Sequence, residues 1–410
     1  MNTGGEAVFH HKKRCFQAPG AAPGARKPRG ATYSAAMFIS NGRLSSLAWL
    51  AIALLLGSAS IHAQQPPPRL QPDSGPWQSG AGFDFDLGAK KLKKARQSVS
   101  GIACNLTAQG KRICLVAFDE GTEARHAEVG DQALTVDAGR VVLRTGGGEL
   151  DAEGAATDGR HVYITGSHSA KRSDCAANPG SRHVLRLRLD PATGRAVRTP
   201  GGALADVADS GRLWQIMQAQ PGLAPHVGER KCLGSAPPEE APRLAGQQGV
   251  NIEGLAVRDG RLYFGFRGPV LNGVALVLSV DADALFASNA GSSARPALAR
   301  LALGSGRGIR DMVAVRNGFL LLAGPDDTPA NQNAGWVVAW WDGQGTAEGG
   351  VVQPRFLATL DLSRVTLRKC DKELKPEAMA VLEETPAAYQ LLVLSDGMCD
   401  GGPLAFTVAH

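Results

Sequence analysis

One segment combines an acidic residue before glycine, two apolar runs separated by Asp-Gly, and a polar tip: Glu149-Leu-Asp-Ala-Glu-Gly-Ala-Ala-Thr-Asp-Gly-Arg-His-Val-Tyr-Ile-Thr-Gly-Ser-His-Ser169. Asp-Gly between two runs of β-forming residues is a strong β-hairpin signal. The same phrase returns at residues 251–268 and 309–327, and in weaker form at 100–121 and 376–397. Five hairpins of one design indicate a repeat protein.

Each hairpin is followed by further strand-like runs, so each unit holds about four strands, as a propeller blade does. The units begin near Ser100, Glu153, Glu253, Asp311 and Glu377. We therefore predict an all-β fold, a β-propeller with five to six four-stranded blades over residues 96–410. The long gap between the second and third units predicts one mostly helical insertion, with almost no helix outside residues 205–222.

The first residues have the pattern of a secretory signal. An apolar run at 47–56 is too short to span a bilayer comfortably, and small residues lead to a cleavage position after Ala63. We predict a leader over residues 1–63, translated from Met1 or from Met37, with an uncleaved anchor as the alternative. Residues 64–95 then form a Pro-rich linker. The strand-like residues 83–87 and 403–408 are expected to close the ring.

Charge argues against a nucleic-acid-binding function. Residues 1–63 hold seven of the 44 Lys and Arg residues and one of the 38 Asp and Glu residues, so the remainder carries 37 of each. Binding of nucleic acid calls for a clustered positive surface on the folded domain. We expect an exported protein, secreted or periplasmic, that is monomeric and not stably inserted in a membrane. Its expected partner is a small anionic molecule or an unknown protein.

Six cysteines remain after residue 63, an even number that suits an oxidising compartment. Cys104 and Cys114 lie on two strands of one predicted hairpin, and Cys370 and Cys399 bracket another. That leaves Cys175 with Cys232. A zinc site is the alternative, but the sequence has no Cys-x-x-Cys pair.

Polar residues recur where a propeller would bring them together. The innermost strand of a blade lines the channel and the next strand runs back beside it, so the start of the first and the end of the second meet at one mouth. Both positions are polar in every unit: Ser100 with Asp119, Glu153 with His168, Glu253 with Arg267, Asp311 with Asp326, and Glu377 with Asp396. Arg310, Lys171 and Arg172 are their neighbours in sequence. We predict one site at this mouth.

The residue types suggest three roles in that site. Glu153 or Glu253 would act as a base and His168 as an acid. A ligand would be bound by Arg267, Arg310, Asp119 and Lys171. Clustered carboxylates also suit Ca²⁺, for which the candidate ligands are Asp311, Asp326, Glu377 and Asp396. The structural alternative is that an acid before glycine bonds backbone amides or pairs with an arginine of the next blade.

Five motifs carry a family resemblance: Glu153-Gly154, Thr165-Gly-Ser-His-Ser169 with Lys171-Arg172, Asn251-Ile-Glu-Gly-Leu-Ala256, Gly306-Arg-Gly-Ile-Arg-Asp311 and Lys375-Pro-Glu-Ala-Met-Ala380. Over roughly residues 96–410 the chain resembles the bacterial domain-of-unknown-function family numbered 3616. More distantly, the Glu-Gly phrase is similar to that of esterase-like phytase propellers, whose acids hold Ca²⁺ and bind phosphate esters. That link is one short motif and transfers no reaction.

Two functions of different classes follow from the predicted site. In the first, the protein is a hydrolase of an anionic ester, either a phosphoester or a carboxyl ester, with assistance from a metal or from the arginines. In the second, it is a non-catalytic propeller scaffold that binds a ligand or a partner protein. The fold alone does not decide between them, because propellers host both.

Overall fold

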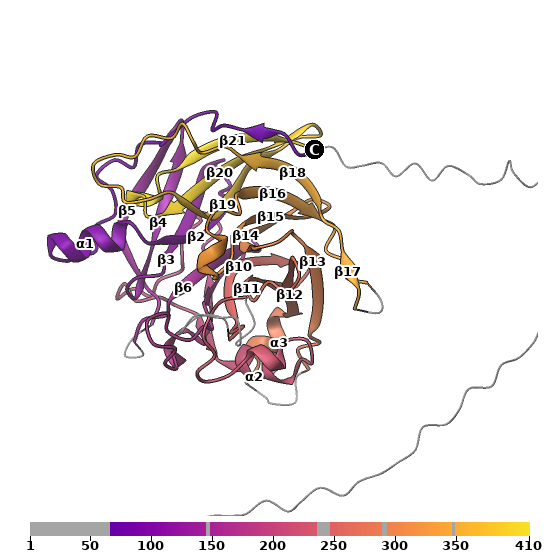
Figure 1. Ribbon diagram of the computed structural model, residues 1–410. Coiled ribbons are helices and arrows are strands. Elements are labelled where there is room, and N and C mark those ends of the chain that lie inside the picture. The colour runs from indigo at the N-terminus through magenta and orange to yellow at the C-terminus, as the bar shows by residue number, and fades with distance from the viewer. Residues whose placement is uncertain (1–65, 145–147, 236–246, 289–292, 347–348) are drawn as a thin grey trace, which may run out of the picture. The chain divides into compact units, whose positions relative to one another are not determined.

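Five sheets form the five blades of a β-propeller (Figure 1). This computed structural model describes residues 66–144, 148–235, 247–288, 293–346 and 349–410. The predicted leader at 1–63 lies outside the described residues. Each inner strand packs against the inner strands of the two neighbouring blades, and the fifth contacts the first, so the ring closes. The prediction of an all-β propeller is confirmed, with five blades rather than six.

The first three blades follow one another along the chain. Blade 1 consists of β2 (Val99–Leu106), β3 (Arg112–Phe118), β4 (Glu123–Gly130) and β5 (Ala133–Val142). Blade 2 consists of β6 (Ala152–Thr157), β7 (His161–Gly166), β8 (Val184–Arg188) and β9 (Val207–Ser210). Blade 3 consists of β10 (Asn251–Arg258), β11 (Arg261–Gly268), β12 (Val274–Asp281), β13 (Ala297–Ala302) and the added β17 (Val351–Val352).

The last two blades use strands from both ends of the described chain. Blade 4 consists of β14 (Arg307–Val315), β15 (Gly318–Pro325), β16 (Trp336–Trp341), β18 (Arg355–Leu360) and β1 (Arg69–Leu70). Blade 5 consists of β19 (Lys375–Glu384), β20 (Ala388–Asp396) and β21 (Leu404–Ala409). The predicted C-terminal strand is thus present, as the third strand of blade 5.

A segment at residues 69–78 runs along the outer edges of three blades and takes the closing role predicted for residues 83–87. Its β1 pairs with β18 of blade 4, Ser74 bridges Ala405 of blade 5, and Gln78 bridges Ala133 of blade 1. In Figure 1 this indigo segment lies beside the yellow C-terminal strands. We call residues 69–78 the closing segment.

Residues 83–87 form no strand, which corrects the sequence prediction. Their alternation has another cause: Phe83 and Phe85 are buried and meet the Phe118 ring edge-on, at 4.8 and 4.9 Å between centroids. They anchor the chain to the core between blades 1 and 5. A segment whose side chains alternate between core and solvent is therefore not always a strand, because a strand also needs a sheet edge to pair with.

Within the ranges that the structure describes, three α-helices flank the sheets. The helix α2 (Arg212–Ala219) lies inside the predicted helical insertion, and Leu213, Trp214 and Met217 bury its apolar face against blades 2 and 3. The insertion also supplies β9, so it completes blade 2 instead of adding a blade. Two helices were not predicted: α1 (Ala89–Arg96) and α3 (Ala282–Phe286). Short 3₁₀ turns occur at Pro179–Ser181, Ala224–His226, Pro329–Asn331 and Cys399–Gly401.

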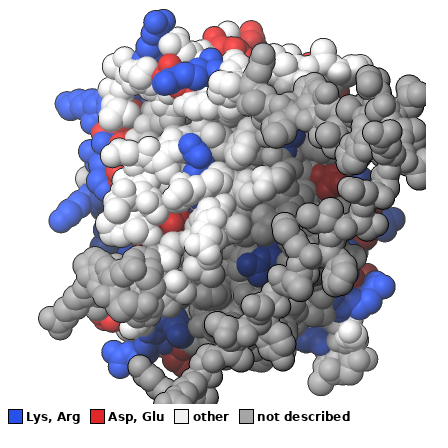
Figure 2. Space-filling model, turned by 45° about the vertical axis from the view of Figure 1, so that its right-hand side comes forward, with Lys and Arg blue, Asp and Glu red and all other residues white. Residues whose placement is uncertain are grey.

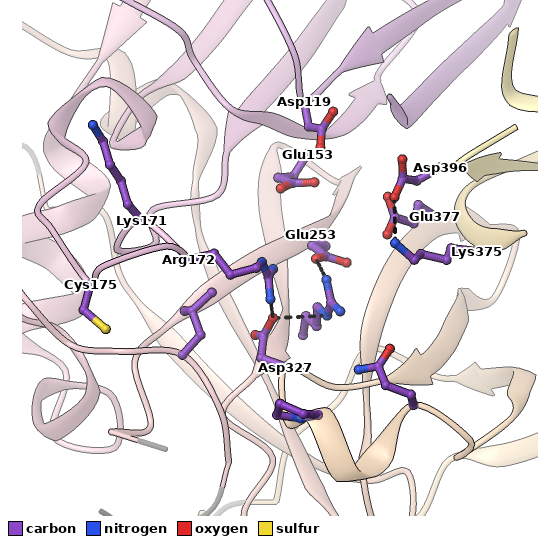
Figure 3. Close-up of a pocket in the computed structure, with 14 residues that line it drawn as sticks. Asp119, Glu153, Lys171, Arg172, Cys175, Glu253, Asp327, Lys375, Glu377 and Asp396 are labelled. Atoms are coloured by element: carbon purple, nitrogen blue, oxygen red, sulfur yellow. Dashed lines mark hydrogen bonds and ion pairs between the residues drawn. The ribbon is translucent and has the colours of Figure 1, made fainter. Parts of the chain in front are cut away.

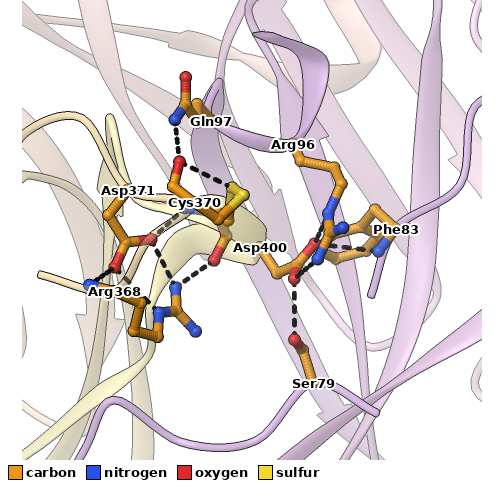
Figure 4. Close-up of a disulfide and its surroundings, with 9 residues drawn as sticks. Ser79, Phe83, Arg96, Gln97, Arg368, Cys370, Asp371 and Asp400 are labelled. Carbon is orange, nitrogen blue, oxygen red and sulfur yellow. Dashed lines mark hydrogen bonds and ion pairs between the residues drawn. A yellow bond between two sulfur atoms is a disulfide. The ribbon is translucent and has the colours of Figure 1, made fainter. Parts of the chain in front are cut away.

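All three predicted disulfides are present, Cys104–Cys114, Cys175–Cys232 and Cys370–Cys399. The first joins directly paired residues of β2 and β3. The third lies beside the contacts of the N-terminal segment with the loop after β20 (Figure 4).

None of the helices in the described ranges has the length and apolarity needed to cross a bilayer. Along the left side of Figure 2, Lys and Arg side chains lie with Asp and Glu side chains among them, beside a surface with few charged residues.

Candidate functional site

A β-bulge at the same place in all five inner strands sets up the channel mouth. The regular pairing of inner and second strands is interrupted at Ser100, Glu153, Glu253, Arg310 and Glu377. A bulge adds one unpaired residue and re-aims its side chain. The five bulged residues are therefore the true structural equivalents, and in blade 4 that residue is Arg310, one position before the predicted Asp311.

The residue after the bulge explains the recurring Glu-Gly phrase. A Cβ on Gly154 would lie 2.8 Å from the Glu253 carbonyl oxygen and from Leu255 Cβ, and one on Gly254 would lie 2.8 Å from Ile309 Cγ2. Glycine thus lets neighbouring inner strands approach closely near the channel. Blade 4 has Asp311 at this place.

Asp311 faces the next blade and does not line the mouth. Its carboxylate accepts the backbone N–H of Met312 at 2.7 Å and that of Met379, on β19, at 2.6 Å. Burial raises the pKa of Asp311 well above its usual value, although both N–H groups act in the opposite direction. Asp311 therefore has the structural role that was the alternative for acids of this motif: it bonds backbone amides and joins two blades.

The mouth opens into a cavity of about 550 Å³ that brings together most of the predicted site (Figure 3). Its predicted charged residues are Asp119, Glu153, Lys171, Glu253, Arg267, Glu377 and Asp396. They come from four blades and span 277 positions of sequence, from 119 to 396. Arg172, Asp327 and Lys375 complete its charged lining. The structure thus brings these side chains together at one mouth, where repeat register predicts them.

Most carboxylates of the mouth are held by basic side chains. Glu253, which is 2% exposed, pairs with Arg267 at 2.8 Å and with Arg310 at 2.6 Å. Arg310 also pairs with Glu377. These contacts join blades 3, 4 and 5 across the channel.

A second group of ion pairs surrounds this network. Asp327 pairs with Arg267 at 3.3 Å and with Arg172 at 3.0 Å, and Lys375 pairs with Asp396 at 3.2 Å. Figure 3 shows Arg172 and Asp327 pointing toward one another from opposite sides. The pairing leaves few carboxylates of the cavity free.

Burial lowers the pKa of both arginines of the network, and the surrounding carboxylates raise it. Burial would lower the pKa of Arg267, but the Glu253 and Asp327 carboxylates outweigh it and raise this pKa. Arg310 is 1% exposed, and burial together with the nearby Arg267 lowers its pKa to about 10. Both side chains therefore stay cationic at neutral pH, and both are engaged by acids.

Asp119 and Glu153 are different, because no basic residue in the described part of the chain forms an ion pair with either. Burial raises the pKa of Glu153 well above its usual value, and the Glu253, Asp151 and Asp119 carboxylates raise it further. Burial likewise raises the pKa of Asp119, with Asp396 and Asp151 adding to the effect. One oxygen of Asp119 is buried without a hydrogen-bond partner. The mouth thus contains two carboxyl groups with raised proton affinity.

Four predicted site residues are absent from the cavity lining: Arg310 and Asp311, described above, and His168 and Asp326. His168 is fully buried, its Nδ1 lies 2.9 Å from the Gly166 carbonyl oxygen, and burial lowers its pKa to about 4. Strand register shows that Ser167, one position earlier, is the equivalent of Asp119 and Arg267. Asp326 accepts hydrogen bonds from Ser235 and from the Thr328 N–H, so it fixes a loop, and its neighbour Asp327 faces the cavity.

The four acids predicted to bind Ca²⁺ do not converge. Asp311 and Asp326 bond to backbone N–H groups, Glu377 pairs with Arg310, and Asp396 pairs with Lys375. Within the ranges that the structure describes, no three His, Cys, Asp or Glu side chains are placed to hold a metal ion together. This donor set does not fit calcium.

The fold and the site define a five-bladed β-propeller with a charged, ion-paired cavity at one mouth of its channel. Residues 203–401 match the family described as protein of unknown function (DUF3616). Over those residues the match confirms the family resemblance seen in the sequence, whereas similarity to phytase propellers stays a prediction. No curated protein matches the chain in sequence.

Similar solved structures include propeller glycoside hydrolases. A GH43 β-1,3-galactosidase bound to galactodeoxynojirimycin is 8% identical, with a TM-score of 0.42 over 83% of this chain and 94% of that one. An exo-β-1,3-galactanase from Phanerochaete chrysosporium is 7% identical, with a TM-score of 0.42 over 82% of this chain and 64% of that one. An α-L-arabinanase from Penicillium chrysogenum is 10% identical, with a TM-score of 0.35 over 83% and 98%. These similarities concern the fold alone.

Proposed function

We propose that the channel mouth is the active site of a hydrolase that acts on a small anionic ester, with Glu153 as the general base. The observation that supports this role is that Glu153 faces the cavity with no ion-pair partner and with a raised pKa. A carboxylate is a better base when its pKa lies nearer the working pH. His168, the acid expected from sequence, cannot reach a ligand in the cavity from its buried place.

The proposed reaction needs only side chains that line the cavity. Glu153 takes a proton from water as the water oxygen attacks the ester carbonyl or phosphorus, and the proton then passes to the leaving alcohol. Arg267, which also lines the cavity, supplies positive charge near the oxygen on which negative charge develops. No step is assigned to a metal ion, because the predicted calcium ligands have other partners.

Glu153→Gln tests the proposal. We expect the variant to lose at least about a hundredfold in kcat/KM on whichever ester the wild type hydrolyses, the usual range for a lost general base. The measurement is a panel of phosphomonoesters, carboxyl esters and lactones, run with Ca²⁺ and with EDTA. The matched control is Glu383→Gln, at an exposed carboxyl of β19 that is absent from the lining of this cavity and of the cavity beside it. Wild-type activity in the Glu153 variant would contradict the proposal.

The pH profile gives a second, independent readout. Because Glu153 must be ionised to act as a base and its pKa is raised, kcat/KM should fall on the acid side with a midpoint above about 4.3, the ordinary value for Glu. The profile is measured on the same substrate between pH 4 and 9. A flat acid side down to the ordinary range would show that another group transfers the proton.

We also propose that the mature protein is exported, because three disulfides persist in an oxidising compartment. Mass spectrometry of protein from a secreting host should show loss of the leader near Ala63 and a mass six hydrogens below that of the reduced chain. Free thiols at Cys175 and Cys232 in the folded protein would contradict this proposal.

A further inference from the structure

The loop between β7 and β8 places two basic side chains over the cavity. Lys171 and Arg172 both line it, and both are exposed. In the described part of the chain, Lys171 makes no ion pair. Arg172 reaches from blade 2 to Asp327, which follows the second strand of blade 4, so it crosses the mouth above blade 3. Figure 3 shows this approach.

The Arg172 contact is one that a ligand could replace at low cost. The side chain of Arg172 is 59% exposed, whereas Asp327 is fully buried and is also held by Arg267. If Arg172 turned to an incoming anion, Asp327 would keep a cationic partner. Only the Arg172 end of this ion pair is exposed to solvent, and the buried carboxylate would not be left without a positive charge beside it. Arg172 can therefore turn toward a ligand, whereas Arg267 and Arg310 are fixed by their buried ion pairs and act from where they stand.

The loop itself is short and tied down. The Lys171 N–H donates to the Ala176 carbonyl and the Cys175 N–H donates to the Lys171 carbonyl, both at 2.9 Å, which closes a tight turn. Cys175 is bonded to Cys232, and Leu233, next to Cys232, lines the same cavity. The disulfide thus fixes the base of the turn against a second loop at the rim. We call residues 171–176 the basic arm.

We propose that the basic arm is the anion subsite of this cavity, with Arg172 and Lys171 binding the negatively charged group of the substrate and the Cys175–Cys232 bond positioning them. This inference rests on the proposed function and names the part of the site that selects the substrate. A guanidinium group binds carboxylate or phosphate through paired N–H donors, and the adjacent ammonium adds charge. The scissile bond would then lie inward, toward Glu153.

Inorganic phosphate is the first probe, titrated calorimetrically into the folded protein at low salt. We expect Arg172→Gln to weaken phosphate binding by about tenfold or more, the effect of losing a hydrogen bond to a charged group. Lys171→Gln should weaken it by a smaller factor. Lys90→Gln, which removes an exposed lysine of α1 away from the cavity lining, is the matched control and should bind as the wild type does. Equal affinity in Arg172→Gln and wild type would overturn the proposal.

A pair of nitrophenyl esters separates this inference from the proposed function. One carries a free carboxylate on its acyl chain, and the other carries the methyl ester of that carboxylate. Arg172→Gln should lower kcat/KM by about tenfold for the anionic ester and less than about twofold for the neutral one. Equal losses on both esters would overturn the subsite. If wild type binds phosphate through Arg172 but hydrolyses neither ester, the subsite stands and the proposed function fails.

The positioning role of the disulfide has its own test. The double variant Cys175→Ser with Cys232→Ser keeps the other two disulfides and releases the base of the arm. We expect phosphate affinity to fall by about threefold to tenfold, because an arm that must be ordered on binding loses affinity. A thermal melt confirms that the variant is folded at the titration temperature. Unchanged phosphate affinity in the folded variant would overturn the positioning role.

Discussion

Glu253→Gln is expected to lower the free energy of unfolding by about 3 kcal/mol, because removing one partner of a buried ion pair leaves the other charge uncompensated. Glu253 is the acid that both Arg267 and Arg310 contact, and Asn251 donates to it at 3.2 Å. Arg310 would keep Glu377 and the Pro325 carbonyl, so the loss should stay near the lower end for buried pairs. Denaturant unfolding at pH 7.5 measures it.

The matched variant Glu153→Gln should shift stability in the opposite direction. Folding raises the pKa of Glu153, so the folded protein holds this proton more tightly than the unfolded chain does. Stability must then fall as the pH rises from about 4 toward the raised pKa, and the amide removes this cost. The variant should be more stable than the wild type at pH 8, and the two should become equally stable below the ordinary pKa of a glutamate, about 4.3.

The two variants together separate residues that hold the ring from residues that serve the site. An acid retained at a cost to stability is typical of a functional group, whereas an acid whose removal destabilises the fold has a structural role whatever else it does. If Glu253→Gln leaves the unfolding curve unchanged, the ion-pair network does not stabilise the propeller. If Glu153→Gln is destabilising at pH 8, its carboxylate has a favourable partner and the general-base assignment loses its support.

Repeat register predicted the convergence at the mouth, since equivalent strand positions in a closed ring must lie at similar radius and height. Glu153, Glu253 and Glu377 lie at the predicted positions. In blade 4 the bulged residue is Arg310, one position before the predicted Asp311, because the sequence pattern aligns Asp311 with the acids and does not mark the bulge. One residue decides which face of a strand a side chain occupies.

Residues outside the repeat could not be placed in this way. Arg172 and Asp327 lie in loops after second strands, where length and direction differ between blades, so the cross-mouth contact has no signal in the repeat. The same holds for the closing segment, which pairs with three blades through a few residues each. Its composition is that of a linker, and only the free outer edges of the blades make it part of the sheets.

Asp400 fastens the N-terminal segment to the loop after β20 (Figure 4). One carboxylate oxygen accepts the Phe83 N–H at 3.0 Å and Arg96 Nε at 2.8 Å, and the other accepts Ser79 Oγ at 2.9 Å. Asp400 is 2% exposed and has a φ of 57°, a left-handed conformation that Asn adopts as readily as Asp does. Asp400→Asn therefore removes the charge without forcing the backbone to change.

We expect Asp400→Asn to lower the free energy of unfolding by about 3 to 5 kcal/mol, the cost of breaking a buried ion pair. Hydrogen exchange should also rise at residues 69–78, because the anchors after the closing segment loosen while the inner strands still close the ring. Asp371→Asn is the matched control: Asp371 lies in the same region and bonds to Arg368 and to the Cys399 N–H, so it should lose stability without exposing residues 69–78. Equal exchange at residues 69–78 in both variants would mean that Asp400 does not secure the closing segment, and that the edge pairing with β18 and β21 holds it in place.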